Sequence, residues 1–394
     1  MTVLVTGYPS SFLARRVADL LLSQGKTVRC VVQRKHMEDA EAHRNALDDP
    51  ARLELIEGDV ASLDLGLSGA EFNALASEVE VIHHCAAVTY LGADRRLAEQ
   101  TNIGGAREIL ELAEAGHGTF QRLVFWSSAL VSGARKGRVL EEELGDGPFR
   151  NAVDETRMRA ERIVRDAMDH VPTTILRPSI VVGDSQTGEI DRLEGPYLLV
   201  LLMLNAPQDL RMPMPGRGDA PLNLVPIDFV VRAGLTIAEH PEAVGQAFHI
   251  VDPAPRSARQ VFELIAEAAG RAVPRGYVPT SFATALMRTP GLERFANVPR
   301  TFLEQLTTDV VWDARRAEPI LRDAKIRGLQ RIREHHGGVR SATELSGSCT
   351  THVSFISWGT PRRFSAPKDH LWNGRSLRGG DASIMRLVHG RGPI

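Results

Sequence analysis

The first part of the chain alternates short apolar runs with longer segments whose apolar residues recur at helical spacing. Residues 2–7 form a strand-like run that ends in a glycine turn, and residues 11–25 show the helical pattern and end at Gly25. Strand-like runs follow at 27–32, 52–60, 79–88, 122–128 and 173–183, and helical patterns at about 94–115 and 151–169. This alternation favours an α/β fold with a doubly wound, Rossmann-like parallel sheet. In such a sheet ligands bind beyond the carboxyl ends of the strands, so the residues just after each strand carry the candidate chemistry.

The regular alternation ends near residue 184. Residues 184–197 are polar and rich in glycine, and residues 205–223 contain several prolines, which predicts loops of a smaller C-terminal substrate lobe. We therefore expect a dinucleotide-binding domain at 1–183, to which some later segments return. The substrate lobe, with returning strands and helices, is expected at 184–335.

The last segment, residues 341–394, has no sustained helical or strand period. It is rich in Ser, Gly and Arg and carries isolated tryptophans. A segment without periodicity cannot bury a continuous apolar face, and we expect it to be a disordered tail outside the folded domain.

Composition and charge are those of an ordinary soluble globular protein: 43% of residues are hydrophobic, 24% are charged, and the formal net charge is −2. The balanced charge gives no reason to expect a nucleic acid as partner, and the longest apolar run, residues 197–204, is too short to cross a bilayer. The first residues enter a strand pattern at once, without the features of a signal peptide. Cys30, Cys85 and Cys349 form no C-x-x-C pair, so we expect a cytoplasmic protein with no disulfide framework and no metal site.

The segment "VTGYPSSFLARR" joins a strand, a glycine turn and a helix N-terminus, as a dinucleotide pyrophosphate requires. Gly7 stands where the tight turn needs it. Ser11 and Ala14 replace the second and third glycines of the usual pattern, with one extra residue between, and Ser11 is expected to crowd or shift the phosphates. The cofactor candidates of this segment are Thr6, Gly7, Ser10, Ser11, Phe12 and Leu13.

Two cations, Arg34 and Lys35, follow the second strand, where an acidic residue would bind the ribose of NAD. Cations at this place suit the 2′-phosphate of NADP, although a solvated charge run is an alternative and NAD stays possible. Further cofactor candidates follow the third and fourth strands: Asp59, Val60, Ala86 and Ala87.

Taken together, these segments resemble an extended short-chain dehydrogenase/reductase. They are most similar to the thioester-reductase and fatty-acyl-CoA-reductase branch, the "male sterility" type of NAD-binding domain. The resemblance covers about residues 1–330 and is carried by "VTGYPSSFLARR", "EGDV", "VIHHCAAVTY", "TNIGGAREILELA", "FWSSALVSG", "RPSIVVGDSQTGEI", "GPY" and "LNLVPIDFVVRA". It implies a small-molecule substrate, such as an acyl thioester or aldehyde, and enzymes of this fold often form homodimers.

The resemblance assigns roles to particular residues. Ser128 matches the hydroxyl that hydrogen-bonds a substrate oxygen, with Ser127 as a neighbour that is easily mistaken for it; a hydroxyl that only caps a strand end is the alternative. Asn102 matches a position that shapes the site. Pro178, Ser179 and Ile180 match the stretch whose backbone passes near the nicotinamide.

The general acid of such enzymes is the tyrosine of a Tyr-x-x-x-Lys pair, which lies on one helix face because its members are four residues apart. Here Val153 and Arg157 occupy the two positions. Valine cannot donate a proton, whereas Arg157 can still hold the nicotinamide ribose. Tyr90, after the fourth strand, is a weak candidate for a substitute donor.

Other titratable groups near this helix receive structural assignments. We expect Asp154 and Glu155 to point elsewhere on the helix, and His83 and His84 to be strand-end residues near the core. The protein is then an NADP-dependent oxidoreductase with impaired or atypical proton transfer, or a catalytically inactive NAD(P)-binding protein that acts as a sensor or partner subunit. A degraded gene product that binds nothing is a third interpretation.

Overall fold

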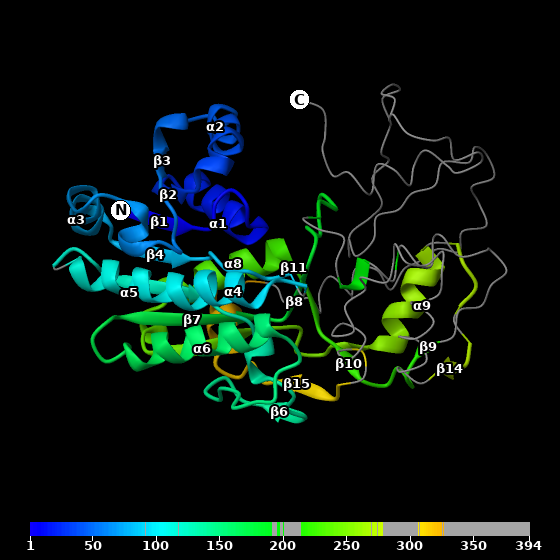
Figure 1. Cartoon of the computed structure of the whole chain (residues 1–394). Coiled ribbons are helices and arrows are strands. Elements are labelled where there is room, and N and C mark those ends of the chain that lie inside the picture. The colour runs from blue at the N-terminus through cyan, green and yellow to red at the C-terminus, as the bar shows by residue number, and fades with distance from the viewer. Residues whose placement is uncertain are drawn as a thin grey trace, which may run out of the picture.

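Seven parallel strands form the central sheet of the computed structural model (Figure 1). Their order across the sheet is β12–β7–β5–β4–β1–β2–β3, so the chain starts in the middle and winds to both sides. This is the predicted doubly wound α/β fold. The strands are β1 (Thr2–Thr6), β2 (Thr27–Val32), β3 (Leu53–Glu57), β4 (Val81–His84), β5 (Arg122–Trp126), β7 (Thr173–Pro178) and β12 (Gln246–Ile250).

The structure describes residues 1–326 except for 191–194, 198–199, 201–213, 279–305 and the single positions 91, 117, 269, 274, 307 and 325. The expectation of a disordered tail at 341–394 lies outside the described residues, as does most of the apolar run at 197–204. In the part of the chain that is described, no helix combines the length and the apolar character that a bilayer span needs.

Helices cover both faces of the sheet because alternate strand residues point to opposite sides. In β1, Val3 and Val5 belong to one apolar core and Leu4 belongs to the other. The first core is covered by α1 (Phe12–Ser23), α2 (Met37–Asn45), α8 (Ile227–Glu239) and α12 (Ala317–Asp323). The second is covered by α3 (Gly69–Glu78), α5 (Gly105–Ala115) and α6 (Ala152–Asp166).

The helix expected at 94–115 is divided into three parts. It begins as α4 (Arg95–Ala98), widens into a π-helix, η4 (Glu99–Gly104), and continues as α5. Short 3₁₀ turns connect other elements: η1 (Arg34–His36), η2 (Pro50–Arg52), η3 (Leu63–Gly66), η5 (Ala129–Ser132) and η6 (Pro241–Ala243).

Small strand pairs lie beyond the carboxyl edge of the main sheet. They are β6 (Gly137–Val139) with β15 (Val310–Trp312), β8 (Ile180–Val182) with β11 (Leu224–Pro226), β10 (Pro221–Leu222) with β13 (Arg256–Ser257), and β9 (Met214–Pro215) with β14 (Tyr277–Val278). A third apolar cluster joins several of these strands to α9 (Ala258–Ala268).

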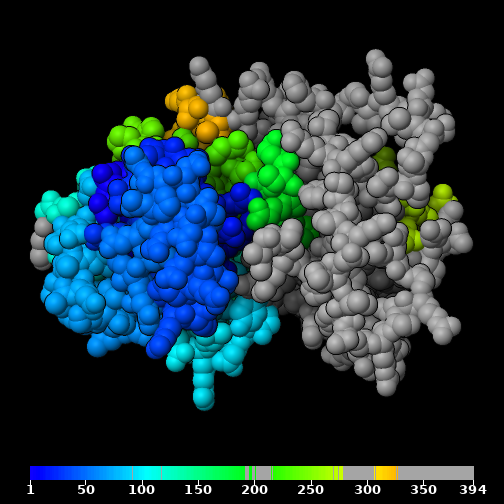
Figure 2. Space-filling view, turned by 90° about the horizontal axis from the view of Figure 1, so that it is seen from above, coloured from blue at the N-terminus to red at the C-terminus, as the bar shows by residue number. Residues whose placement is uncertain are grey.

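Later segments return to the main sheet through buried polar contacts. Glu141 accepts the backbone N–H of His249 in β12 at 3.0 Å and that of Arg316, just before α12, at 2.6 Å. Burial raises the pKa of Glu141 to about 7. In addition, Arg16 of α1 forms ion pairs with Asp184 and Glu189. In the view from above, the surface of the N-terminal residues (blue) borders that of later segments (green) (Figure 2).

The end of β5 packs tightly against α8. A Cβ atom on Gly234 would lie only 2.2 Å from Cη2 of Trp126, whose ring is buried. Interior packing at this density leaves no room for a methyl group without displacing the ring.

We expect Gly234→Ala to lower the free energy of unfolding by about 1–3 kcal/mol, because overpacking outweighs the better helix propensity of alanine. Gly69→Ala is the matched control, since Gly69 begins α3 and has no atom within 4 Å of its added Cβ. Urea unfolding of both variants measures the difference. Equal stability of the two variants would contradict the packing argument.

Candidate active site

The turn after β1 is shaped by a glycine. Gly7 has a φ of +87°, and a Cβ on it would lie 2.9 Å from the backbone of Ala86, which follows β4. Thr6 holds the same junction, because its Oγ1 accepts the N–H of Ala86 at 3.2 Å and lies 2.9 Å from Nδ1 of His84. The carboxyl ends of β1 and β4 therefore meet closely, and only glycine fits between them.

Ser11 serves as the N-cap of α1. Its Oγ accepts the N–H of Ala14 at 3.3 Å, and its own N–H donates to the carbonyl oxygen of Gly7 at 2.8 Å. Ser10 is exposed and its hydroxyl also reaches that carbonyl, at 3.2 Å. The extra residue is thus absorbed in the turn, and the positive end of the helix dipole lies beside the candidate phosphate site. The remaining candidates of this segment open α1 and are partly buried: Phe12 and Leu13.

Arg34 and Lys35 lie exposed in η1, directly after β2. The Arg34 side chain is 90% exposed, and its Nε is 4.0 Å from Oε1 of Glu57, at the limit of an ion pair. Both cations are accessible to an anionic group. The exposure of the two side chains fits either contact with the 2′-phosphate of NADP or two solvated surface charges.

The candidates after β3 and β4 lie at the same edge of the sheet. Asp59 accepts the N–H of Ala61 at 3.0 Å, and Val60 is buried. Ala86 and Ala87 line a cavity of about 240 Å³ together with Arg157. Small side chains here leave space above the sheet.

The two neighbouring serines after β5 have different surroundings. Ser127 is buried and donates to Oε2 of Glu161 at 2.5 Å, which is a structural contact within the core. Ser128 begins η5, where its Oγ accepts the N–H of Leu130 at 3.2 Å. Ser128 is also buried, but an accepting hydroxyl oxygen can still donate its own proton, so its role toward a substrate oxygen stays a prediction.

The stretch after β7 leads from the sheet toward the substrate side. Pro178 ends β7, and the hydroxyl of the buried Ser179 donates to Oδ1 of Asn223 at 2.7 Å. Ile180 begins β8 and lines a second cavity. The hydroxyl of Ser179 is thus committed to a contact within the protein.

Arg157 points back to the end of β5. Its Nη2 donates to the carbonyl oxygens of Ser127 at 2.8 Å and Trp126 at 3.3 Å. Burial lowers the pKa of this guanidinium, and no described carboxylate lies within 4 Å of it. A guanidinium remains protonated even so, which leaves a positive charge beside the cavity.

Asn102, in the π-helix η4, connects two parts of the site. Its Oδ1 accepts the N–H of Val88 at 2.8 Å, and its Nδ2 donates to Oγ1 of Thr156 in α6 at 2.9 Å. Asn102 also lines the cavity that contains Arg157. It therefore holds α6 against the chain that leaves β4.

Val153 is buried in a small apolar cluster with Val88 and Ala98. Tyr90 is partly buried and packs against the same cluster. The position expected for the catalytic tyrosine is therefore filled by aliphatic packing. Tyr90 is the described tyrosine that lies near it, and its role as a proton donor stays a prediction.

Asp154 is buried at the first turn of α6 and takes part in the electrostatics of the site. Its Oδ2 accepts a hydrogen bond from Nδ2 of Asn151 at 2.8 Å. Burial raises the pKa of Asp154 to about 6, against the opposing effect of the positive charges of Arg157 and Arg150. Glu155 in contrast pairs with Arg95 at 2.8 Å near the surface.

Other groups considered from the sequence have structural contacts. The pKa of His83 falls to about 3 and that of His84 to about 4 because both rings are buried, so both are neutral near pH 7. The hydroxyl of Tyr8 lies 2.5 Å from Nδ1 of His43, and that of Tyr197 accepts the N–H of Gly183 at 2.6 Å. The free thiols of the buried Cys30 and Cys85 lie in the described part; Cys349 lies outside it.

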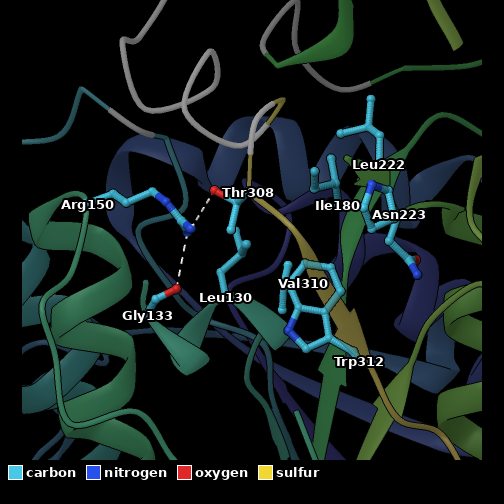
Figure 3. A pocket seen from close by; sticks show the side chains of 10 residues that line it. Leu130, Gly133, Arg150, Ile180, Leu222, Asn223, Thr308, Val310 and Trp312 are labelled. Atoms are coloured by element: carbon cyan, nitrogen blue, oxygen red, sulfur yellow. Dashed lines mark hydrogen bonds between the residues drawn. The ribbon is translucent and has the colours of Figure 1, made fainter. Parts of the chain in front are cut away.

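A second cavity lies next to η5 (Figure 3). Arg150 extends along one side, where Nη1 donates to the carbonyl oxygen of Gly133 at 3.2 Å and Nη2 to Oγ1 of Thr308 at 2.9 Å. Most of the other lining is apolar: Leu130, Ile180, Leu222, Val310 and Trp312. Sequence reasoning had singled out only Ile180 here. The one signal in the sequence that could have found Arg150 is its position three residues before Val153.

Three carboxylates gather at a different place. One ligand oxygen each from Asp64, Glu108 and Glu111 lie within 4.8 Å of one another, and Glu108 accepts the N–H of Asp64 at 2.8 Å. Acidic groups of this kind are common without an ion. The absence of a metal site stays a prediction.

The parallel sheet with this strand order, the glycine turn before α1 and the cavities at its carboxyl edge define an extended short-chain dehydrogenase/reductase with an NAD(P)-binding, Rossmann-like domain. A model of NAD-binding domains described as male sterility protein matches residues 6–234, more than half of the chain. The chain belongs to this family, in the thioester-reductase branch of the superfamily.

Proteins with similar sequences and structures support this assignment. Glycine betaine reductase ATRR of Emericella nidulans is 30% identical over 281 residues, which are 66% of this chain and 22% of that protein. The non-canonical nonribosomal peptide synthetase FrzA of Cladobotryum sp. is 28% identical over 270 residues, which are 63% of this chain and 25% of that protein. This chain thus spans no more than about a quarter of either relative. The terminal R domain of the myxalamid PKS-NRPS pathway matches with a TM-score of 0.67 at 26% identity, over 82% of this chain and 85% of that one.

The raised pKa of Asp154 predicts a pH-dependent stability. Because its folded value of about 6 lies above the ordinary 3.8, the folded state binds the proton more tightly, and this contribution to stability is lost as pH rises from about 4 to about 6. The free energy of unfolding of Asp154→Asn, relative to that of wild type, should therefore increase by up to about 3 kcal/mol as pH rises from about 4 to about 6. Urea unfolding of both proteins between pH 4 and 7 measures this gain. A constant difference in stability would show that Asp154 titrates normally.

Proposed function

We propose that this chain is an NADP-dependent reductase of an acyl thioester or aldehyde, with atypical proton transfer. The observation that carries the proposal is the cavity lined by Ala86, Ala87 and the cationic Arg157 at the carboxyl edge of β4 and β5. A nicotinamide ribose would lie at such an edge in a sheet of this type. The names of the relatives, a glycine betaine reductase and an R domain, support a reductase.

The residues present fit a dinucleotide. The glycine turn after β1 passes close to the backbone of Ala86, and α1 begins directly behind it, so the positive end of the helix dipole would lie near a phosphate. Arg34 and Lys35 would hold a 2′-phosphate, and Arg157 would hold the nicotinamide ribose. When bound, the reduced cofactor supplies a hydride.

The protein's own groups then bind and polarise the substrate. The hydroxyl of Ser128 donates a hydrogen bond to the carbonyl oxygen, and Arg157 stabilises negative charge that develops nearby. Asn102 keeps α6 in place through Thr156. Val153 has no proton to give, and the loss of a positioned general acid typically slows a reaction by about 10²–10⁴-fold. The reaction proposed here is therefore slow.

A second function, an inactive NAD(P)-binding sensor or partner subunit, is favoured by the aliphatic packing of Val153. The two functions share cofactor binding and differ in turnover. A homodimer and a division into domains at about residue 183 also stay part of the proposal.

Cofactor choice is tested by calorimetric titration with NADPH and NADH. We expect tighter binding of NADPH, and Arg34→Ala with Lys35→Ala should weaken it by about 10–100-fold while NADH binding is unchanged, since only NADPH carries the phosphate. Arg107→Ala, which removes an exposed charge on α5, is the control. Failure to bind either nucleotide would exclude both proposed functions.

Proton transfer is tested with the double variant Val153→Tyr with Arg157→Lys. It should raise the rate of NADPH-dependent aldehyde reduction by about 10²-fold or more, because a phenol and its lysine partner are restored. Val153→Phe with Arg157→Lys is the matched control, with the same bulk and no hydroxyl. A wild type that is already as fast as the tyrosine variant would show that another general acid is in place.

A further inference from the structure

Arg150 carries a positive charge into the cavity beside η5 (Figure 3). Both of its hydrogen-bond acceptors are neutral oxygens, those of Gly133 and Thr308. No carboxylate of the described residues lies within 4 Å of its guanidinium. Asp154 interacts with Arg150 over a longer distance: burial raises the pKa of Asp154 to about 6, and the positive charge of Arg150 opposes this rise.

A comparison with Arg177 shows what a structural arginine looks like in this protein. Arg177 is fully buried, and its Nη2 and Nε both donate to the carboxylate of Glu161. Arg150 is half-buried instead, and its two hydrogen bonds use only part of the five N–H donors of a guanidinium. It can therefore accept a further, anionic partner.

The cavity lies on the substrate side of the proposed site. Leu130 belongs to η5, which Ser128 caps, and Gly133 directly follows that turn. Ile180 comes from the stretch that the family resemblance places near the nicotinamide. A molecule in this cavity would thus contact the turn that directly follows the serine proposed to bind the reacting carbonyl.

We propose that Arg150 binds a carboxylate on the substrate, so that the preferred substrate is a small acyl thioester or aldehyde with an apolar body and an anionic end. The proposal rests on the reductase function above and names its substrate class. The apolar walls contact the body, and the guanidinium forms charge-assisted hydrogen bonds with the carboxylate.

A phosphate could in principle supply the negative charge, for instance from a carrier arm. The position of Arg150 argues for the substrate's own carboxylate, because the cation lies in the same small cavity as the walls formed by η5 and β8. The anion and the reacting carbonyl then belong to one short molecule.

Binding of hexanoate and hexanamide to the full chain with NADP⁺ present tests the proposal by calorimetry. The two probes share length and shape and differ in charge. Wild type should bind hexanoate at least about tenfold more tightly. Arg150→Gln should abolish that preference, Arg150→Lys should keep part of it, and Arg107→Gln should keep all of it.

Three results would overturn the proposal: no preference for hexanoate in wild type, a preference that survives in Arg150→Gln, or tighter binding of inorganic phosphate than of hexanoate at this site. Thermal melts of the two Arg150 variants show whether they fold. Because these titrations need no turnover, the carboxylate site and the reductase activity fail independently. If the protein reduces aldehydes but does not prefer hexanoate over hexanamide, the proposed reductase function stands and the carboxylate site is excluded.

Discussion

The buried ion pair between Arg177 and Glu161 joins three elements that border the candidate site. Both side chains are fully buried, with Nη2 of Arg177 2.5 Å from Oε1 of Glu161. Burial alone would raise the pKa of Glu161, but the charges of Arg177 and Arg165 and the hydroxyl of Ser127 hold it below its usual range. Removal of one partner of such a pair typically costs about 3–5 kcal/mol, because the other charge stays buried.

This pair joins α6 to β7, and its neighbours extend the connection. Ser127 brings in the end of β5, and Nη1 of Arg177 donates to the carbonyl oxygens of Glu141 and Glu143. The rotation of α6 about its axis is thereby set. One turn before Glu161, Arg157 faces the end of β5, and one further turn back Val153 enters the apolar cluster with Val88.

The site that results keeps the scaffold of a short-chain reductase and lacks one of its chemical groups. The close junction of Gly7 with Ala86, the hydroxyl of Ser128 and the charge of Arg157 all suit a nucleotide and a carbonyl substrate. Val153 packs among aliphatic side chains, so no proton donor occupies that position. The charge of Arg150 lies at a different cavity from the one that Arg157 lines.

The sequence by itself determined the fold class, because apolar periodicity and glycine turns are local features that survive without knowledge of packing. The resemblance to the family also assigned Val153 and Arg157 to the positions of the Tyr-x-x-x-Lys pair, and this assignment stays a prediction. The sequence assigned Ser128 rather than Ser127 through the resemblance alone, without the contacts that separate the two, and it did not find Arg150. These depend on which side chains from distant segments meet: Glu161 takes the hydroxyl of Ser127, and Thr308 approaches Arg150 from 158 residues away. Only the tertiary structure brings such partners together, because their contact is decided by packing and burial rather than by neighbouring residues.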